Sequence, residues 1–230
     1  MNGCCWLRSP EGGRSGHDNI ADIGCVRIMD DCISTRHLLR FGLSGAGGDK
    51  FMSRNSRVGA RFYCLFAAIA VATYLIHEAA HWVMGAALGY EVSYGINSVV
   101  PGTAMTARDQ ILMSAAGPAI TILVGLFAFI LVMRRQSLTA YAALYFALFM
   151  RVVAAGVSVF NLNDEARISD MLGWGQWALP GVVILVLLIP TIIASRHLQL
   201  HWKVNVLAYV VSSLVTTLVV GIDMVHRGTI

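Results

Sequence analysis

Two histidines and a glutamate stand close together in an apolar part of this 230-residue chain. They belong to the segment HEAAH, which runs from His77 to His81 and carries Glu78 directly after the first histidine. On an α-helix, side chains four positions apart lie about 40° apart around the axis, so both imidazoles share one face. Glu78 lies about 60° from His81, close enough to contact a water beside a bound ion. Two imidazoles that hold Zn²⁺ and a carboxylate that takes a proton from water are the chemistry of a zinc hydrolase.

The composition of the chain indicates that these polar residues lie in a membrane. Of its residues 57% are apolar and 13% charged, with a mean hydropathy of +0.66, whereas a soluble domain has about 45–50% apolar and about 25% charged residues. The composition excludes a disordered chain and argues against a water-soluble enzyme. A net charge of +4 gives no reason to expect nucleic-acid binding. A charge at the centre of a membrane span costs about 2.5 kcal/mol or more, so the histidines and the glutamate need a partner, which a metal would supply.

Several apolar runs are long enough to cross a bilayer, which takes about 20 residues. We therefore expect an all-α polytopic membrane protein with about five transmembrane helices. Between the first two runs, residues 90–108 contain Gly, Pro and β-branched residues and predict a loop or short hairpin at the membrane surface. This strand-like segment could pair with an extended peptide. The five runs cover about residues 62–85, 111–133, 139–160, 177–194 and 204–222.

The charges outside these runs suggest a domain division and an orientation. Residues 1–55 are rich in Gly, Ser, Arg and Asp without a sustained period, and we expect a poorly ordered N-terminal tail before a transmembrane domain over residues 56–230. A cytoplasmic N-terminus puts most flanking basic residues on the cytoplasmic side, as membrane proteins prefer. We expect a multi-pass protein of a bacterial-type cell membrane in this orientation. The flanking residues concerned are Arg54, Arg57, Arg61, Arg134, Arg135, Arg196 and Lys203.

A zinc site of this kind needs a third protein ligand. The best candidate is Asp164, in the segment FNLNDEARISD just after the third apolar run. The HEAAH helix leaves the membrane on the side where that run ends, so Asp164 can reach both histidines. Glu165 and Asp170 are the alternatives. A plainer role for Asp164 is to cap the short helix that DEARIS would start.

The order of these motifs resembles the site-2-protease family of intramembrane zinc metalloproteases. The resemblance rests on HEAAH in an apolar helix, on SAAGPAIT (114–121) in the next, and on an Asn-Asp pair after a later one, and it covers about residues 62–182. It implies a three-helix core in which the AGP-containing helix packs between the other two. It also implies that His77, His81 and Asp164 bind zinc and that Glu78 is the catalytic acid/base. The sequence departs from the family pattern at Thr121, where an Asn is usual, and in the stretch NLNDEARISDMLG.

The expected function is therefore hydrolysis of peptide bonds in transmembrane protein substrates, within the lipid bilayer. The alternative is a non-catalytic membrane protein, either a metal-binding scaffold or a transporter with histidines along an ion path. A transporter would be expected to show broken helices in two related halves, which the sequence lacks. Arg151 falls inside the third apolar run, where an unpaired cation is costly, and we expect it to form a structural ion pair. Gly117 and Pro118 predict a point of close helix packing.

Overall fold

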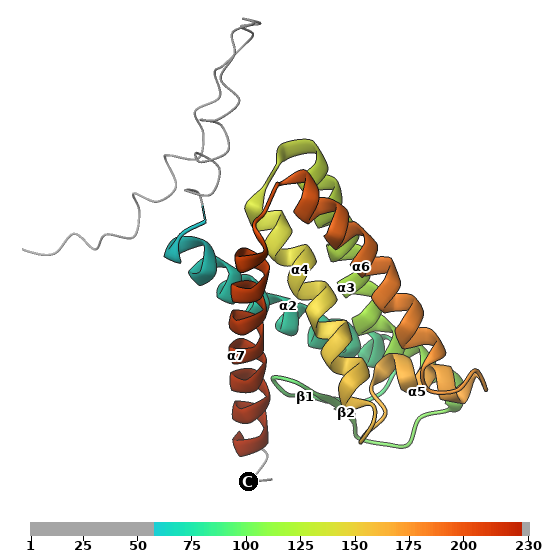
Figure 1. Ribbon diagram of the computed structural model, residues 1–230. Helices are drawn as coiled ribbons and strands as arrows, with labels where there is room; N and C mark the ends of the chain where they lie inside the picture. Colours follow the sequence, from blue (N-terminus) through green and yellow to red (C-terminus); the bar gives the residue numbers. More distant parts are fainter. Residues whose placement is uncertain (1–57, 227–230) are drawn as a thin grey trace, which may run out of the picture. The chain divides into compact units, whose positions relative to one another are not determined.

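The computed structural model describes residues 58–226 (Figure 1). The N-terminal tail expected over residues 1–55 lies outside the described residues. Within the described part, the chain forms six helices and one antiparallel two-stranded hairpin. The elements are α2 (Ala60–Ala87), β1 (Val92–Tyr94), β2 (Val99–Pro101), α3 (Ala107–Arg135), α4 (Leu138–Val157), α5 (Asp164–Met171), α6 (Ala178–His197) and α7 (Trp202–His226).

Five of the helices, α2, α3, α4, α6 and α7, are long and apolar enough to cross a membrane. Their bounds lie within a few residues of the five predicted runs, so that prediction is confirmed. Large apolar side chains cover their outward faces, and Leu123, Phe127, Leu214 and Leu218 are each more than 60% exposed. Such wide apolar surfaces are suited to lipid, and helices satisfy their own backbone hydrogen bonds there. The chain is an all-α multi-pass membrane protein.

Local sequence signals explain where the helices begin and end. The side chain of Thr106 caps α3 by accepting a hydrogen bond from the Asp109 N–H, and Ser137 caps α4 in the same way through the Ala140 N–H. Gln136 ends α3 in the left-handed conformation, with φ of 51°. A left-handed residue followed by a capping serine produces the tight turn between α3 and α4.

Helix α4 lies at the centre of the described part and contacts α2, α3, α6 and α7. On one side, its Phe146 packs edge-to-face against Phe66 and Tyr74 of α2. On the other side, its Leu144 belongs to a second apolar cluster with Leu187 of α6. Helices α2, α3 and α4 contact one another pairwise, and α3 also contacts α5. This packing fixes the position of the segment that follows α4.

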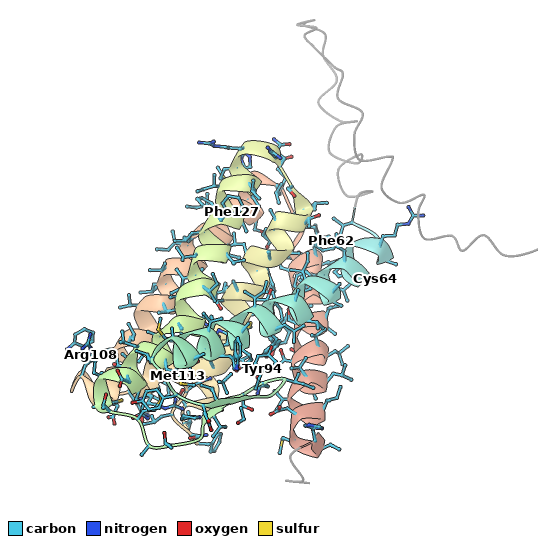
Figure 2. All side chains as sticks on the ribbon, turned by 180° about the vertical axis from the view of Figure 1, so that it is seen from behind. Phe62, Cys64, Tyr94, Arg108, Met113 and Phe127 are labelled. Atoms are coloured by element: carbon cyan, nitrogen blue, oxygen red, sulfur yellow. The ribbon has the colours of Figure 1, made fainter. Side chains whose placement is uncertain are left out.

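The hairpin and α5 lie at the same end of the helical bundle (Figure 1). The α3–α4 turn and the connection between α6 and α7 lie at the other end. In the hairpin, Val92 pairs with Pro101 and Tyr94 with Val99, so of the loop or short hairpin predicted between the first two spans the structure has the hairpin. The Tyr94 hydroxyl donates to the Leu75 carbonyl oxygen of α2 at 3.3 Å, and Figure 2 shows Tyr94 beside that helix. A hydrogen bond therefore connects the hairpin to α2, the helix that carries HEAAH.

Candidate metal centre

The two histidines of HEAAH face the inside of the protein and converge on Asp164. His77 and His81 are 4% and 6% exposed, and their Nε2 atoms lie 3.2 Å apart. The Asp164 Oδ2 atom lies 3.3 Å from the His77 Nε2 atom and 3.2 Å from that of His81. Among the described residues, these three side chains form the one group of His, Cys, Asp or Glu that could share a metal ion.

The segment after α4 brings Asp164 to the histidines. The two alternative ligands, Glu165 and Asp170, do not reach them. Asp164 is the first residue of α5, and its N–H donates to the Asn163 side chain. The cap of this helix is therefore Asn163, which corrects the capping role considered for Asp164. Asp170 is exposed. Glu165 is buried and pairs with Arg151 of α4.

The hydrogen bonds behind the imidazoles determine which ring nitrogens carry protons. The His81 Nδ1 atom lies 2.7 Å from the Met113 carbonyl oxygen, which can only accept, so Nδ1 carries the proton. The His77 Nδ1 atom lies 3.1 Å from the Thr121 hydroxyl, whose own proton is donated to the Gly117 carbonyl oxygen at 2.9 Å. That hydroxyl must therefore accept from His77. In the neutral rings, both Nε2 atoms present lone pairs to Asp164.

Three acceptor atoms consequently meet at one buried point with no donor between them. Such a cluster needs a positive charge, which is either a proton on one ring or a metal ion. Zinc bonds of about 2.1 Å in a tetrahedral site separate ligand atoms by about 3.4 Å, close to the separations seen here. Zinc binds to a set of two neutral imidazoles and one carboxylate, and here each imidazole also donates its Nδ1 proton to an acceptor behind it. The residues present therefore fit the metal that the family resemblance implies.

The charge of Asp164 suits the same role. Burial alone would raise the pKa of its carboxyl group, but a hydrogen bond from a protonated His77 or His81 ring outweighs burial and holds that pKa below its usual range, and a bound cation would act in the same direction. The side chain is 13% exposed and lies at the edge of the membrane-spanning helices. Asp164 is therefore an anion at neutral pH and ready to bind a cation.

Helix α3 approaches the histidines through a glycine. A Cβ atom built on Gly117 would overlap the His81 Nε2 atom and the His77 Cε1 atom. Only a residue without a side chain leaves this space free between α3 and the rings. The close packing predicted for Gly117 is thus found, and the partners are the two imidazoles.

A cavity of roughly 1210 Å³ opens beside the three side chains. It is lined by α2, α3, α4 and α7, by the segment that leads from α4 into α5, and by the hairpin with the loop that follows it. Glu78, which is 6% exposed, contributes to this lining next to both histidines. From the hairpin side, residues 97–105 line the cavity. Polypeptide or water in this space would therefore meet Glu78 and the metal-binding atoms together.

Two arginines lie around Asp164 and join α5 to its neighbours. Arg151 donates from Nη1 to the Glu165 Oε1 atom at 2.8 Å, and the two side chains are 3% and 4% exposed. The structural ion pair predicted for Arg151 is therefore present. Arg167 donates from Nη1 to the Ser114 hydroxyl of α3 at 3.3 Å and from Nη2 to the Leu162 carbonyl oxygen at 3.1 Å.

Sequence reasoning missed the groups that orient the rings. In the sequence, Thr121 stands out only as a departure from a family pattern, yet it accepts the His77 Nδ1 proton. No side-chain type could reveal the Met113 carbonyl, because every residue has one. The four-residue spacing of Gly117 and Thr121, which puts both on one face of a helix, was the available signal.

Comparison with known proteins gives no match to this chain from a family model, a curated protein or a solved structure. What indicates the function of this chain is the chemistry of the site and its place among five apolar helices.

Proposed function

We propose that this protein is an intramembrane zinc metalloprotease, which hydrolyses peptide bonds of membrane-embedded protein substrates. The observation that carries the proposal is the convergence of two imidazole Nε2 atoms and one carboxylate oxygen at separations of 3.2–3.3 Å, beside a buried glutamate. His77, His81 and Asp164 would hold the zinc. When bound, zinc supplies Lewis-acid activation of a carbonyl group and of a water molecule.

Glu78 has the role of general base and then general acid. It takes one proton from the attacking water, whose oxygen bonds to the carbonyl carbon of the scissile peptide. It then returns that proton to the peptide nitrogen as the C–N bond breaks, which leaves a carboxyl group and an amine. Its place beside His77 on α2 and in the lining of the cavity supports this role.

The cavity supports a polypeptide as the substrate. A transmembrane helix has internally hydrogen-bonded carbonyl groups, so a helical substrate must unwind locally before a water can attack it. The volume of roughly 1210 Å³ exceeds that of a usual small-molecule pocket, about 300–1,000 Å³. Strand β2 and the loop after it form one wall, where an extended peptide has backbone groups to pair with.

The test combines metal analysis with cleavage. The full chain, purified in detergent, is incubated with candidate single-span proteins, with and without a zinc chelator, and its metal content is measured. We expect about one zinc ion per chain and cleavage that the chelator stops. Glu78→Gln should keep the zinc but lower the cleavage rate by about 10²–10⁴-fold, the usual contribution of a general base.

The His77→Ala variant is the matched comparison, because it should lose zinc and cleavage together. Full cleavage by Glu78→Gln would contradict the role of the base. A third outcome would favour the metal-binding scaffold. In that outcome, the natural chain and Glu78→Gln both bind zinc at full occupancy, and neither cleaves any tested substrate.

A further inference from the structure

Asp164, the third side chain of the candidate metal centre, lies on a very short helix. Helix α5 has eight residues, and an isolated helix of this length is not stable in water. It contacts α3, α4 and α6. Its position, and with it the position of the Asp164 carboxylate, must therefore come from these neighbours.

The tightest polar contact between α5 and its neighbouring helices α3, α4 and α6 is the ion pair between Arg151 and Glu165. It measures 2.8 Å, and both side chains are almost completely buried. By contrast, the contact of Arg167 with Ser114 is 3.3 Å long and only partly buried. The described residues form three ion pairs between helices. Two of them involve a histidine, and the third is the Arg151–Glu165 pair.

This ion pair is a costly way to hold two helices together. Removing both charges from water costs free energy that their attraction often fails to offset, and apolar residues of similar size are frequently as stable. The Arg151 Nε atom is also buried and has no hydrogen-bond partner in the structure, which adds to the cost. The pair therefore contributes something other than stability, and geometric specificity is the best-known reason to keep such a pair.

The position of Glu165 in the sequence indicates what is being specified. Glu165 follows Asp164 directly, and neighbouring helical residues point about 100° apart around the axis. Glu165 points to α4, whereas Asp164 points to α2. Fixing Glu165 on α4 therefore fixes the rotation of α5, and this rotation determines where the Asp164 oxygen atom lies.

We infer that Arg151 and Glu165 are positioning residues of the candidate metal centre, because their buried ion pair fixes the rotation of α5 that brings Asp164 to His77 and His81. The inference rests on the proposed function, since it assigns a role toward the same metal. Groups at such a site must be held within about 0.5 Å and 10–20° of the working geometry. In this role, both residues act through Asp164.

Cobalt binding tests the inference without any substrate. Co²⁺ replaces Zn²⁺ in tetrahedral sites, and its visible absorption reports the arrangement of the ligands. The full chain in detergent is titrated with Co²⁺, and then with Zn²⁺ as competitor. Glu165→Gln keeps the size of the side chain and an oxygen that accepts from Arg151, but removes the charge. We expect it to bind Co²⁺ about 10–100-fold more weakly than the natural chain, with a changed spectrum.

Two further variants separate positioning from stability. Tyr141→Phe removes a partly buried hydrogen bond from the other end of α4, and should bind Co²⁺ as the natural chain does. The double variant Arg151→Met with Glu165→Met removes both charges and keeps similar volumes, so it should match the natural chain in thermal stability. Its affinity for Co²⁺ should nevertheless stay at least tenfold lower.

The outcomes are distinguishable from failure of the proposed function. If the natural chain binds neither Co²⁺ nor Zn²⁺, the metal centre itself is wrong, and the inference with it. If the natural chain binds the metal and Glu165→Gln has the same affinity and spectrum, only the inference is overturned. Recovery of full affinity in the double variant would also overturn it, because the pair would then be a structural contact that apolar packing replaces.

Discussion

Each end of the helical bundle contains a polar cluster that is at least partly buried, and the two differ in their balance of donors and acceptors. At the α3–α4 end, the Tyr141 hydroxyl donates to the Asn205 Oδ1 atom at 2.7 Å, and the Asn205 Nδ2 atom donates to the Ser195 hydroxyl at 3.0 Å. Tyr145 donates to the Asn205 backbone oxygen at 2.9 Å. We call these four residues the tyrosine cluster. Each of its hydrogen bonds pairs a donor with an acceptor supplied by the protein.

The candidate metal centre has no such balance. Its protons are all directed away from the centre, toward Thr121 and the Met113 carbonyl, and its lone pairs are directed inward. Membrane helices can bury polar groups cheaply when these groups satisfy one another, as in the tyrosine cluster. Polar groups that need an outside cation are the sign of a functional site. The difference in proton balance distinguishes the two clusters.

Among substitutions that test the contrast between the two clusters, Gly117→Ala is expected to have the largest effect on zinc content. The added methyl group overlaps both imidazoles, so the rings must move and the lone pairs no longer converge. We expect zinc content to fall below one-tenth of that of the natural chain, with a loss of about 1–3 kcal/mol in unfolding free energy from overpacking. Metal analysis and denaturant unfolding in detergent would measure both.

Gly156→Ala is the matched control for that substitution. Gly156 lies in α4, and a Cβ atom there meets nothing within 4 Å. Zinc content should be unchanged in this variant. Normal zinc binding by Gly117→Ala would show that α3 does not pack against the two imidazoles as closely as described.

A smaller effect is expected from Thr121→Val. Valine has nearly the same shape but cannot accept the His77 Nδ1 proton, so the preferred tautomer and ring orientation are lost. Zinc affinity should fall by about 10–100-fold, as is usual when such a partner of a metal ligand is removed. A competition titration with a chelator of known affinity measures the change.

Thr191→Val provides the comparison for Thr121→Val. Thr191 is 5% exposed and donates to the Leu187 carbonyl oxygen at 2.7 Å, within α6 and away from the histidines. Its replacement should leave zinc affinity unchanged. Equal zinc affinities of the two variants would show that Thr121 has no specific role in the metal centre.

The smallest effect, and one of a different kind, is expected in the tyrosine cluster. Tyr141→Phe removes a hydrogen bond and leaves the Asn205 oxygen without this donor. The unfolding free energy should fall by about 1 kcal/mol, while zinc content and cleavage stay the same. A change in zinc content would mean that the two ends of the bundle are coupled, contrary to the contrast drawn between them.

Much of the fold followed from the sequence, since a run of about 20 apolar residues leaves few alternatives to a transmembrane helix. The shared face of His77 and His81 also followed, because helical periodicity is local. Asp164 could be placed near them only by counting membrane crossings, with Glu165 and Asp170 as rivals. The capping role considered as an alternative for Asp164 belongs to Asn163, and the sequence could not separate the two because either side chain can cap a helix.

The sequence by itself determined the membrane-spanning helices, a loop or short hairpin between the first two, and the pairing of two imidazoles on one helical face. Each of these depends on residues close together in the chain. Only the tertiary structure decided that Gly117 and Thr121 of α3 face the rings, and that Glu165 turns to Arg151 while Asp164 turns to the histidines. These contacts depend on the rotation of whole helices about their axes, which is set by packing across the bundle and not by any local pattern.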